Sequence, residues 1–261
     1  MEVFSIAYKN IKMMYKNVLF LIFLIVVPIF QIYLINMIVE NAAKAENAGV
    51  AQGFVEVSII SKGATMLAIG EFSTGIVVQF ILLSGILAGA MIVGEREDNT
   101  LMRIFAAPIS KIKILSGILI SHSVIILTVS AIIIIAVKLF FGISFGNSWI
   151  DIGIVTLFAV YVSAALAFLI TGVFKSPKIA GAIMSVVIII MTFLSGGMIP
   201  GKQFDEISKF TINKWISDSY QKLMEGNSLA SISTNLLIIG IIGTIFMIIA
   251  AVVYRRESIY E

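Results

Sequence analysis

Six uninterrupted apolar runs, each about as long as a membrane-spanning helix, constrain this chain more than any other feature. A helix needs about 20 apolar residues to cross the hydrocarbon core of a bilayer, and within that core it satisfies its own backbone hydrogen-bonding groups. The runs lack the alternation that strands of a membrane barrel show. The sequence therefore predicts an all-α, polytopic membrane protein that forms one domain over residues 1–261. The six predicted spans cover approximately 18–38, 72–93, 114–137, 151–174, 179–199 and 231–254.

Composition excludes a soluble domain and most catalytic chemistry. Apolar residues make up 59% of the chain and charged residues 13%, whereas a soluble domain carries about 45–50% and about 25%. The absence of cysteine excludes disulfides, thiolate metal sites and a lipoprotein anchor, and one histidine argues against zinc or haem. No Gly-x-x-x-x-Gly-Lys-Ser/Thr motif is present. We therefore expect this chain to bind no metal, cofactor or nucleic acid.

The basic residues indicate the orientation of the spans. If both termini are cytoplasmic, the segments on that side hold eleven of the 18 basic residues and six of the 15 acidic residues. Cytoplasmic loops of membrane proteins carry an excess of Lys and Arg. The sequence thus predicts cytoplasmic termini.

The residues before the first span form an amphipathic pattern. Lys9, Lys12 and Lys16 repeat at helical spacing opposite apolar and aromatic side chains, so the segment is either a helix in the inner interface or a basic flank that fixes topology. Ala43 and Ala45 form a small-x-small site that would suit signal-peptide cleavage, but the preceding apolar run exceeds the roughly 7–15 residues of a signal peptide. The external segment 39–71 is too short for a domain, and its alternation at 55–59 fits either a short strand or a loop.

The loop between the second and third spans holds the densest cluster of charges. Asp98 or Asn99 can cap a short helix, and Pro108 would end it, which predicts a short amphipathic helix on the cytoplasmic surface. Its charged residues are Glu95, Arg96, Glu97, Asp98 and Arg103, and its apolar face consists of Leu101, Ile104 and Phe105.

Polar and small residues within the spans predict helix packing. No Asp, Glu, Lys or Arg lies near the middle of a span, which argues against ion-coupled transport. The polar candidates for inter-helix hydrogen bonds or for the lining of a path are Gln31, Asn36, Gln79 and His122. The pairs Gly85/Gly89 and Ser163/Ala167 have the four-residue spacing of tight helix contacts, either within one chain or between two.

Two motifs carry a resemblance to a known family. The charged loop, with Glu95, Glu97, Thr100, Leu101 and Pro108 to Ser110, resembles the corresponding loop of the type-2 ABC exporter permeases. Residues 194–200 resemble the Leu-Ser-Gly turn and proline of that family, and 211–215 resemble its Thr-Pro-Asn-x-Trp helix, with Ile212 in the place of proline. Leu-Ser-Gly-Gly also opens the signature of ABC ATPases, but here it ends a span and no other nucleotide motif accompanies it.

The resemblance implies a permease that exports an amphipathic substrate from a bacterial cytoplasmic membrane. It implies a separate ATPase that binds ATP and magnesium, and a second permease copy or a related permease as partner. Segment 200–230 would then be re-entrant, whereas its aromatic pattern alone indicates an interfacial helix with Trp215 and Tyr220 at headgroup level.

Two other function classes compete with an ABC permease. They are a secondary transporter or channel, and an intramembrane enzyme or structural protein; the spans lack the catalytic pairs that an intramembrane enzyme needs. The implied ATPase-coupling residues are Glu95, Arg96, Glu97, Asp98, Thr100, Leu101, Arg103, Phe105 and Pro108, and the implied external gate is Ser195, Gly196, Gly197, Pro200 and Trp215.

Overall fold

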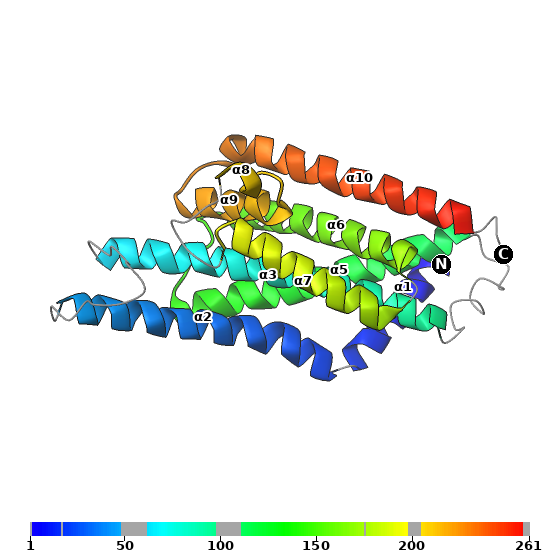
Figure 1. Ribbon diagram of the computed structural model, residues 1–261, viewed down its shortest axis with the longest axis horizontal. Helices are drawn as coiled ribbons and strands as arrows, with labels where there is room; N and C mark the ends of the chain where they lie inside the picture. Colours follow the sequence, from blue (N-terminus) through cyan, green and yellow to red (C-terminus); the bar gives the residue numbers. More distant parts are fainter. Residues whose placement is uncertain are drawn as a thin grey trace.

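The computed structural model is an elongated bundle of helices, and it describes residues 2–16, 18–47, 62–97, 111–174, 176–197 and 205–257 (Figure 1). All regular structure in these ranges is helical, which confirms the predicted all-α class. The α-helices are α1 (Glu2–Lys16), α2 (Val18–Asn47), α3 (Lys62–Glu97), α5 (Lys111–Phe141), α6 (Trp149–Val173), α7 (Pro177–Leu194), α8 (Asp205–Ser208), α9 (Ile212–Met224) and α10 (Ser233–Glu257), with a 3-10 helix η1 (Leu229–Ile232).

Five of these helices are long and apolar enough to cross a membrane. The crossing segments are Leu21–Val39, Ile69–Ile86, Ser116–Phe141, Trp149–Ile170 and Leu229–Val253. The fifth predicted span, 179–199, corresponds to α7, whose 18 residues extend about 27 Å and whose apolar part, Lys178–Leu194, is shorter than the five crossing segments. The structure thus supports a multi-pass protein with five clear spans, and a crossing by α7 remains a prediction.

Two helices extend well beyond the predicted spans. The helix α2 continues to Asn47, through Ala, Lys and Glu residues that favour helix, and α3 begins at Lys62, ten residues before the predicted start. Helical backbone therefore occupies most of the segment 39–71, for which the sequence did not determine a structure. The alternating residues 55–59 lie outside the described residues.

The helix α3 lies at the centre of the bundle and contacts α2, α5, α6, α7 and α9. It packs most closely on α6, where a Cβ atom at Gly85 would lie 2.1 Å from the Ser163 Oγ. A Cβ atom at Gly89 would lie 2.9 Å from the Ala167 backbone oxygen. The two small-residue pairs found in the sequence therefore contact each other within one chain, and the Ser163 hydroxyl donates a hydrogen bond across the contact to the Ile81 backbone oxygen at 2.8 Å.

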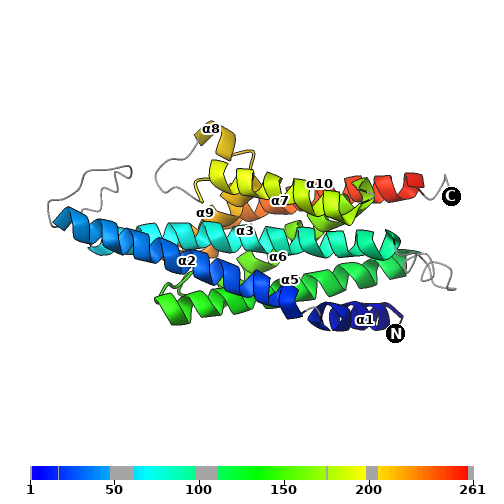
Figure 2. The same cartoon turned by 60° about the horizontal axis from the view of Figure 1, so that its bottom comes forward.

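The N-terminal helix α1 packs along α5 at the end of the bundle where both termini lie (Figure 2). Ala7 and Asn10 are buried in this contact, and the α5 residue Gly117 allows the close approach because a Cβ atom there would lie 2.9 Å from the Val3 backbone oxygen. The aromatic residues Phe4 and Tyr8 stay exposed. The predicted helix is present, and its position in the membrane interface remains a prediction. The helices α8 and α9 lie at the opposite end of the bundle.

Candidate functional site

The end of α7 has the geometry that its glycines predict. Gly196 adopts a left-handed φ of 82°, and the Gly197 N–H donates to the Thr192 backbone oxygen at 3.0 Å. These features define a Schellman C-cap, which ends a helix and redirects the chain. Ser195 is the C-cap residue and its hydroxyl donates to the same Thr192 oxygen at 2.9 Å. Three predicted gate residues thus form one turn, and Pro200 lies outside the described residues.

The turn after α7 presses directly on the central helix. A Cβ atom at Gly75 of α3 would lie 2.4 Å from the Gly197 Cα, so only glycine permits this approach. Because both backbones meet without side chains between them, the end of α7 has a fixed position against α3.

The helix α9 follows with clear start and stop signals. Thr211 is its N-cap, with a side chain that accepts from the Lys214 N–H at 3.4 Å. Gly226, with a φ of 85°, ends it in a second Schellman turn. Ile212, which stands where relatives have proline, occupies the first helical position. Proline suits that position, so the departure from the family pattern leaves the helix start intact.

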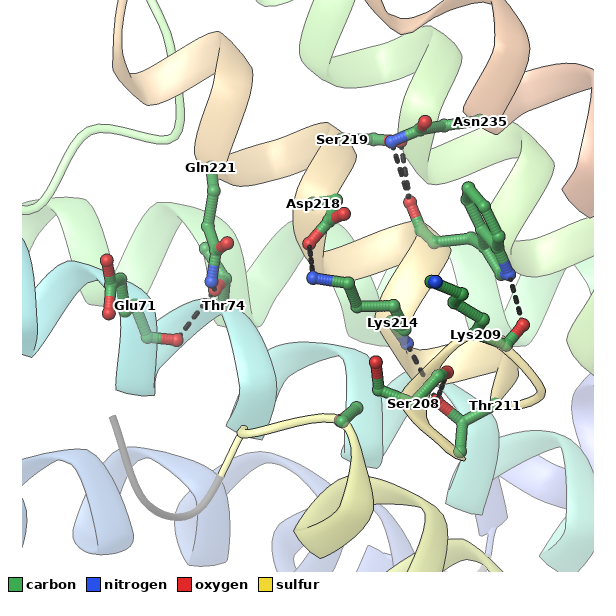
Figure 3. Close-up of polar contacts among 12 residues, drawn as sticks. Glu71, Thr74, Ser208, Lys209, Thr211, Lys214, Asp218, Ser219, Gln221 and Asn235 are labelled. Atoms are coloured by element: carbon green, nitrogen blue, oxygen red, sulfur yellow. Dashed lines mark hydrogen bonds and ion pairs between the residues drawn. The ribbon is translucent and has the colours of Figure 1, made fainter. Parts of the chain in front are cut away.

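Side-chain hydrogen bonds connect α9 to all four helices that surround it. Two of them are visible in Figure 3, where the Gln221 Nε2 donates to the Thr74 Oγ1 of α3 at 3.4 Å and the Asn235 Nδ2 of α10 donates to the Trp215 backbone oxygen at 3.5 Å. The other two join Asn213 to Thr192 of α7 at 2.7 Å, and Tyr220 to Thr156 of α6 at 2.9 Å.

Tyr220 is fully buried, which corrects the prediction that it anchors an interfacial helix at headgroup level. Its ring packs edge-on against Phe145, with the ring centroids 5.6 Å apart. Burial raises the pKa of the Tyr220 hydroxyl. The apolar and aromatic spacing of α9 therefore reflects packing against protein on the α6 side.

Trp215, the remaining predicted gate residue, stabilises the connection into α9. Its indole Nε1 donates to the Lys209 backbone oxygen at 2.9 Å, and its half-buried ring packs against the hydrophobic core. On the next turn, Lys214 and Asp218 form a 2.9 Å ion pair in which both side chains are about four-fifths covered.

Two buried polar atoms on α9 have no hydrogen-bond partner among the residues that the structure describes. They are the Asn213 Oδ1 and the Ser217 Oγ, which lie four residues apart and so on the same side of the helix. Such atoms are uncommon in folded proteins, since each loses its hydrogen bond to water on burial.

A polar cavity of about 240 Å³ lies beside the C-terminal end of α9. It lies between the loop that joins α5 to α6 and the loop that leads to α10, and it is partly open. Its lining residues are Gly146, Asn147, Ser148, Asp151, Leu223, Gly226, Asn227 and Ser228.

The polar candidates within the spans lie in different surroundings. His122 is buried, and its Nδ1 lies 2.7 Å from the Ile118 backbone oxygen one turn earlier in α5. Gln79 is buried in α3, whereas Gln31 and Asn36 are half-buried on α2. The four residues thus lie on three different helices, α2, α3 and α5.

The predicted coupling segment falls mostly outside the described residues. Helix α3 continues to Glu97, so Glu95, Arg96 and Glu97 occupy its last turn, at the end of the bundle that also holds the termini. Asp98, Thr100, Leu101, Arg103, Phe105 and Pro108 lie in the part that the structure does not describe.

The sequence analysis missed the residues that hold α9 in place. Thr74, Thr156 and Thr192 lie between 21 and 147 residues from their partners on α9. Each is a threonine in an apolar stretch of helix, and threonines in such helices commonly bond to their own backbone, so nothing in the sequence marks these three.

Comparison with known families gives one match that extends over nearly the whole chain. The model of a family described as "ABC-2 family transporter protein" matches residues 3–252. No curated protein matches the chain.

Proposed function

The chain belongs to the ABC-2 transporter family, and from this premise we propose that it is the permease of an exporter that moves an amphipathic substrate outward with energy from a separate ATPase. The observation that carries the proposal is the family match over residues 3–252. A sequence without a phosphate-binding loop agrees with a division of labour in which the partner binds ATP and magnesium.

Energy would enter at the end of the bundle that holds both termini. The most charged loop of the chain follows α3 there, and charges at the rim of an interface favour docking of a complementary surface. We assign Glu95, Arg96, Glu97, Asp98 and Arg103 to contact with the ATPase. The apolar side chains of Leu101, Ile104 and Phe105 would attach the loop to the membrane domain.

The opposite end would close the substrate path. Helix α9 is short, amphipathic and held by side chains from α3, α6, α7 and α10. A helix of 13 residues extends about 20 Å, too short to span a bilayer, so it fits a re-entrant element that enters the outer side. With cytoplasmic termini, α9 is the external closure of the path.

The functional assembly would contain two permease chains and two ATPase domains in the cytoplasmic membrane of a bacterium. Native mass measurement of the complex, solubilised from cells that express the chain with the ATPase of its neighbouring gene, tests this composition. We expect one permease to one ATPase subunit in a particle that contains two of each and hydrolyses ATP. A monomeric permease without an ATPase that still transports would contradict the proposal and favour a secondary transporter or channel.

A further inference from the structure

The helix α9 presents chemically different sides to its neighbours. Toward α6 and the loop before it, α9 presents Tyr220 and Leu223. Their partners are Thr156 of α6 and, in that loop, Phe145 and the backbone at Gly146. Toward α10 it presents the Trp215 backbone oxygen, which accepts from both Ser219 and Asn235 (Figure 3). Its third side faces α3 and α7 and is polar apart from Met224, whose side chain lies against Gly70 of α3.

That third side forms a polar seam, which we define as Asn213, Ser217 and Gln221 of α9 with Thr192 of α7 and Thr74 of α3. The three α9 residues are spaced four apart, so they form one stripe along the helix. Asn213 donates to Thr192 and Gln221 donates to Thr74, and Ser217 lies between them.

The hydrogen-bond capacity of the seam is not used completely. The Thr192 hydroxyl donates to the Ile188 backbone oxygen at 2.8 Å, so it can only accept from Asn213, and this fixes the Asn213 amide with its Nδ2 toward Thr192. The Asn213 Oδ1 is then left without a partner, as is the Ser217 Oγ. Water would satisfy both atoms if the seam opened, whereas burial in the closed seam leaves each atom's desolvation uncompensated.

The α6 side contrasts with the seam. The Tyr220 hydroxyl is paired, and the ring makes an edge contact with Phe145. The Leu223 side chain fits against Gly146, where a Cβ atom would approach to 3.1 Å. Separation on this side would break a hydrogen bond and expose a large aromatic ring with no unpaired atom to gain water, whereas separation along the seam breaks two hydrogen bonds but returns the Asn213 Oδ1 and the Ser217 Oγ to water.

We propose that α9 moves as one unit with α6 and α10, and that this end of the bundle opens along the polar seam, between α9 and the pair α3 and α7. The inference rests on the proposed role of α9 as the closure of the path, and it identifies the contact along which α9 separates from its neighbours. The two unpaired atoms raise the free energy of the closed state relative to the open state, and so keep the two states close enough in free energy for a partner to switch them.

Two serines on α9 provide a matched test, because the natural chain contains no cysteine. Ser217 lies in the seam and Ser219 lies on the α10 side, and the two are 4% and 0% exposed. Single Ser217→Cys and Ser219→Cys variants of the permease, in complex with its ATPase in lipid nanodiscs, would be treated with a small charged methanethiosulfonate. We expect Ser217→Cys to react at least tenfold faster, and its rate to change on addition of ATP.

Equal reaction rates for the two variants, or faster reaction of Ser219→Cys, would overturn the inference. So would a Ser217→Cys variant that stays unreactive with and without ATP. Gel filtration of both variants checks that each is folded and bound to the ATPase. Because labelling and ATPase binding are measured separately, a permease that binds no ATPase but opens at the seam would contradict the proposed function alone.

A second measurement needs no labelling. Ser217→Ala removes a hydroxyl that has no partner, whereas Ser219→Ala removes one that donates to the Trp215 oxygen at 2.8 Å. We expect Ser217→Ala to keep or raise the melting temperature in detergent and Ser219→Ala to lower it. A decrease for Ser217→Ala equal to that for Ser219→Ala would show that Ser217 is satisfied, and would remove the basis of the inference.

Discussion

The Tyr220 hydroxyl of α9 donates a 2.9 Å hydrogen bond to the Thr156 hydroxyl of α6, across 64 residues of sequence. The direction of this bond follows from Thr156, whose own hydrogen is directed at the Ile152 backbone oxygen at 2.7 Å. The pair joins a short helix, which cannot be stable alone, to a long span of the bundle. Much of the position of α9 therefore depends on one buried tyrosine.

Replacement of Tyr220 by phenylalanine is expected to lower the free energy of unfolding by about 1 kcal/mol, the usual value of a hydrogen bond. The ring and its contact with Phe145 remain, so the variant isolates the hydroxyl. Thermal unfolding in detergent measures the change. Tyr33→Phe is the matched control because Tyr33 is 53% exposed on α2. An equal melting temperature for both variants would contradict a structural role for the Tyr220 hydroxyl.

The same hydroxyl predicts a dependence on alkaline pH. Burial raises the pKa of Tyr220 in the folded state, whereas the unfolded state titrates near pH 10. The stabilisation is thus fully present below about pH 10 and decreases as the pH rises above it, because only the unfolded state then releases the proton. We expect the melting temperature of the natural chain to fall more steeply above that pH than that of Tyr220→Phe. Parallel curves for the two proteins would contradict the prediction.

Gly85→Ala is expected to destabilise the contact between α3 and α6. The added Cβ would lie 2.1 Å from the Ser163 Oγ and 2.6 Å from the Ser163 backbone oxygen, and such overpacking costs about 1–3 kcal/mol. Gly153→Ala is the control, because nothing lies within 4 Å of a Cβ there and alanine favours helix. Gel-filtration profiles after heating compare the two. Equal stability of both variants would show that the helices can move apart without loss.

The predicted orientation can be tested with single cysteines. Ala45→Cys and Ser228→Cys should react with an impermeant maleimide added to intact cells, while Ser110→Cys and Ser176→Cys should react only after permeabilisation. The excess of basic residues on the side of the termini is the reason. Reaction of Ser110→Cys in intact cells would reverse the orientation, and α9 would then lie on the cytoplasmic side.

Charge reversal in the loop after α3 is expected to weaken binding of the ATPase. Glu97→Lys and Arg103→Glu each change one charge at the proposed interface, and exposed charges contribute modestly one at a time, so the double variant should bind several-fold more weakly than either single variant. Pull-down of the ATPase and ATP-dependent transport measure the effect. Glu206→Lys at the opposite end of the bundle is the control. Normal ATPase binding by the double variant would identify the loop as a simple connector.

The helical architecture could be predicted because apolar runs of this length have one stable structure in lipid. The spacing of Gly85 with Gly89 and of Ser163 with Ala167 predicted two tight contact faces, but it did not indicate that the two faces contact each other, nor whether the contacts lie within a chain or between chains. The structure resolves that alternative through the 2.8 Å bond from Ser163 to the Ile81 oxygen.

The surroundings of α9 could not be predicted, for a physical reason. An apolar pattern with four-residue spacing, such as that of Ile212, Ile216 and Tyr220, buries equally well in lipid or in protein. Only the tertiary contacts decide, and here Tyr220 is covered by Phe145 and Thr156. The unpaired atoms of Asn213 and Ser217 are likewise a property of the packed helices and leave no trace in the order of residues.

The central helix α3 connects the two ends of the bundle without a break in the helix. It is a single helix of 36 residues that contains no proline, so it extends about 54 Å. Its last turn precedes the charged loop, and near its first turns Gly70 contacts Met224 of α9 while Gly75 contacts Gly197. Under the proposed coupling, an axial shift or rotation imposed at Glu97 is carried toward Thr74 along one continuous helix. In that case the contacts of Gly70 with Met224 and of Gly75 with Gly197 must accommodate the displacement that the partner generates at the other end of α3.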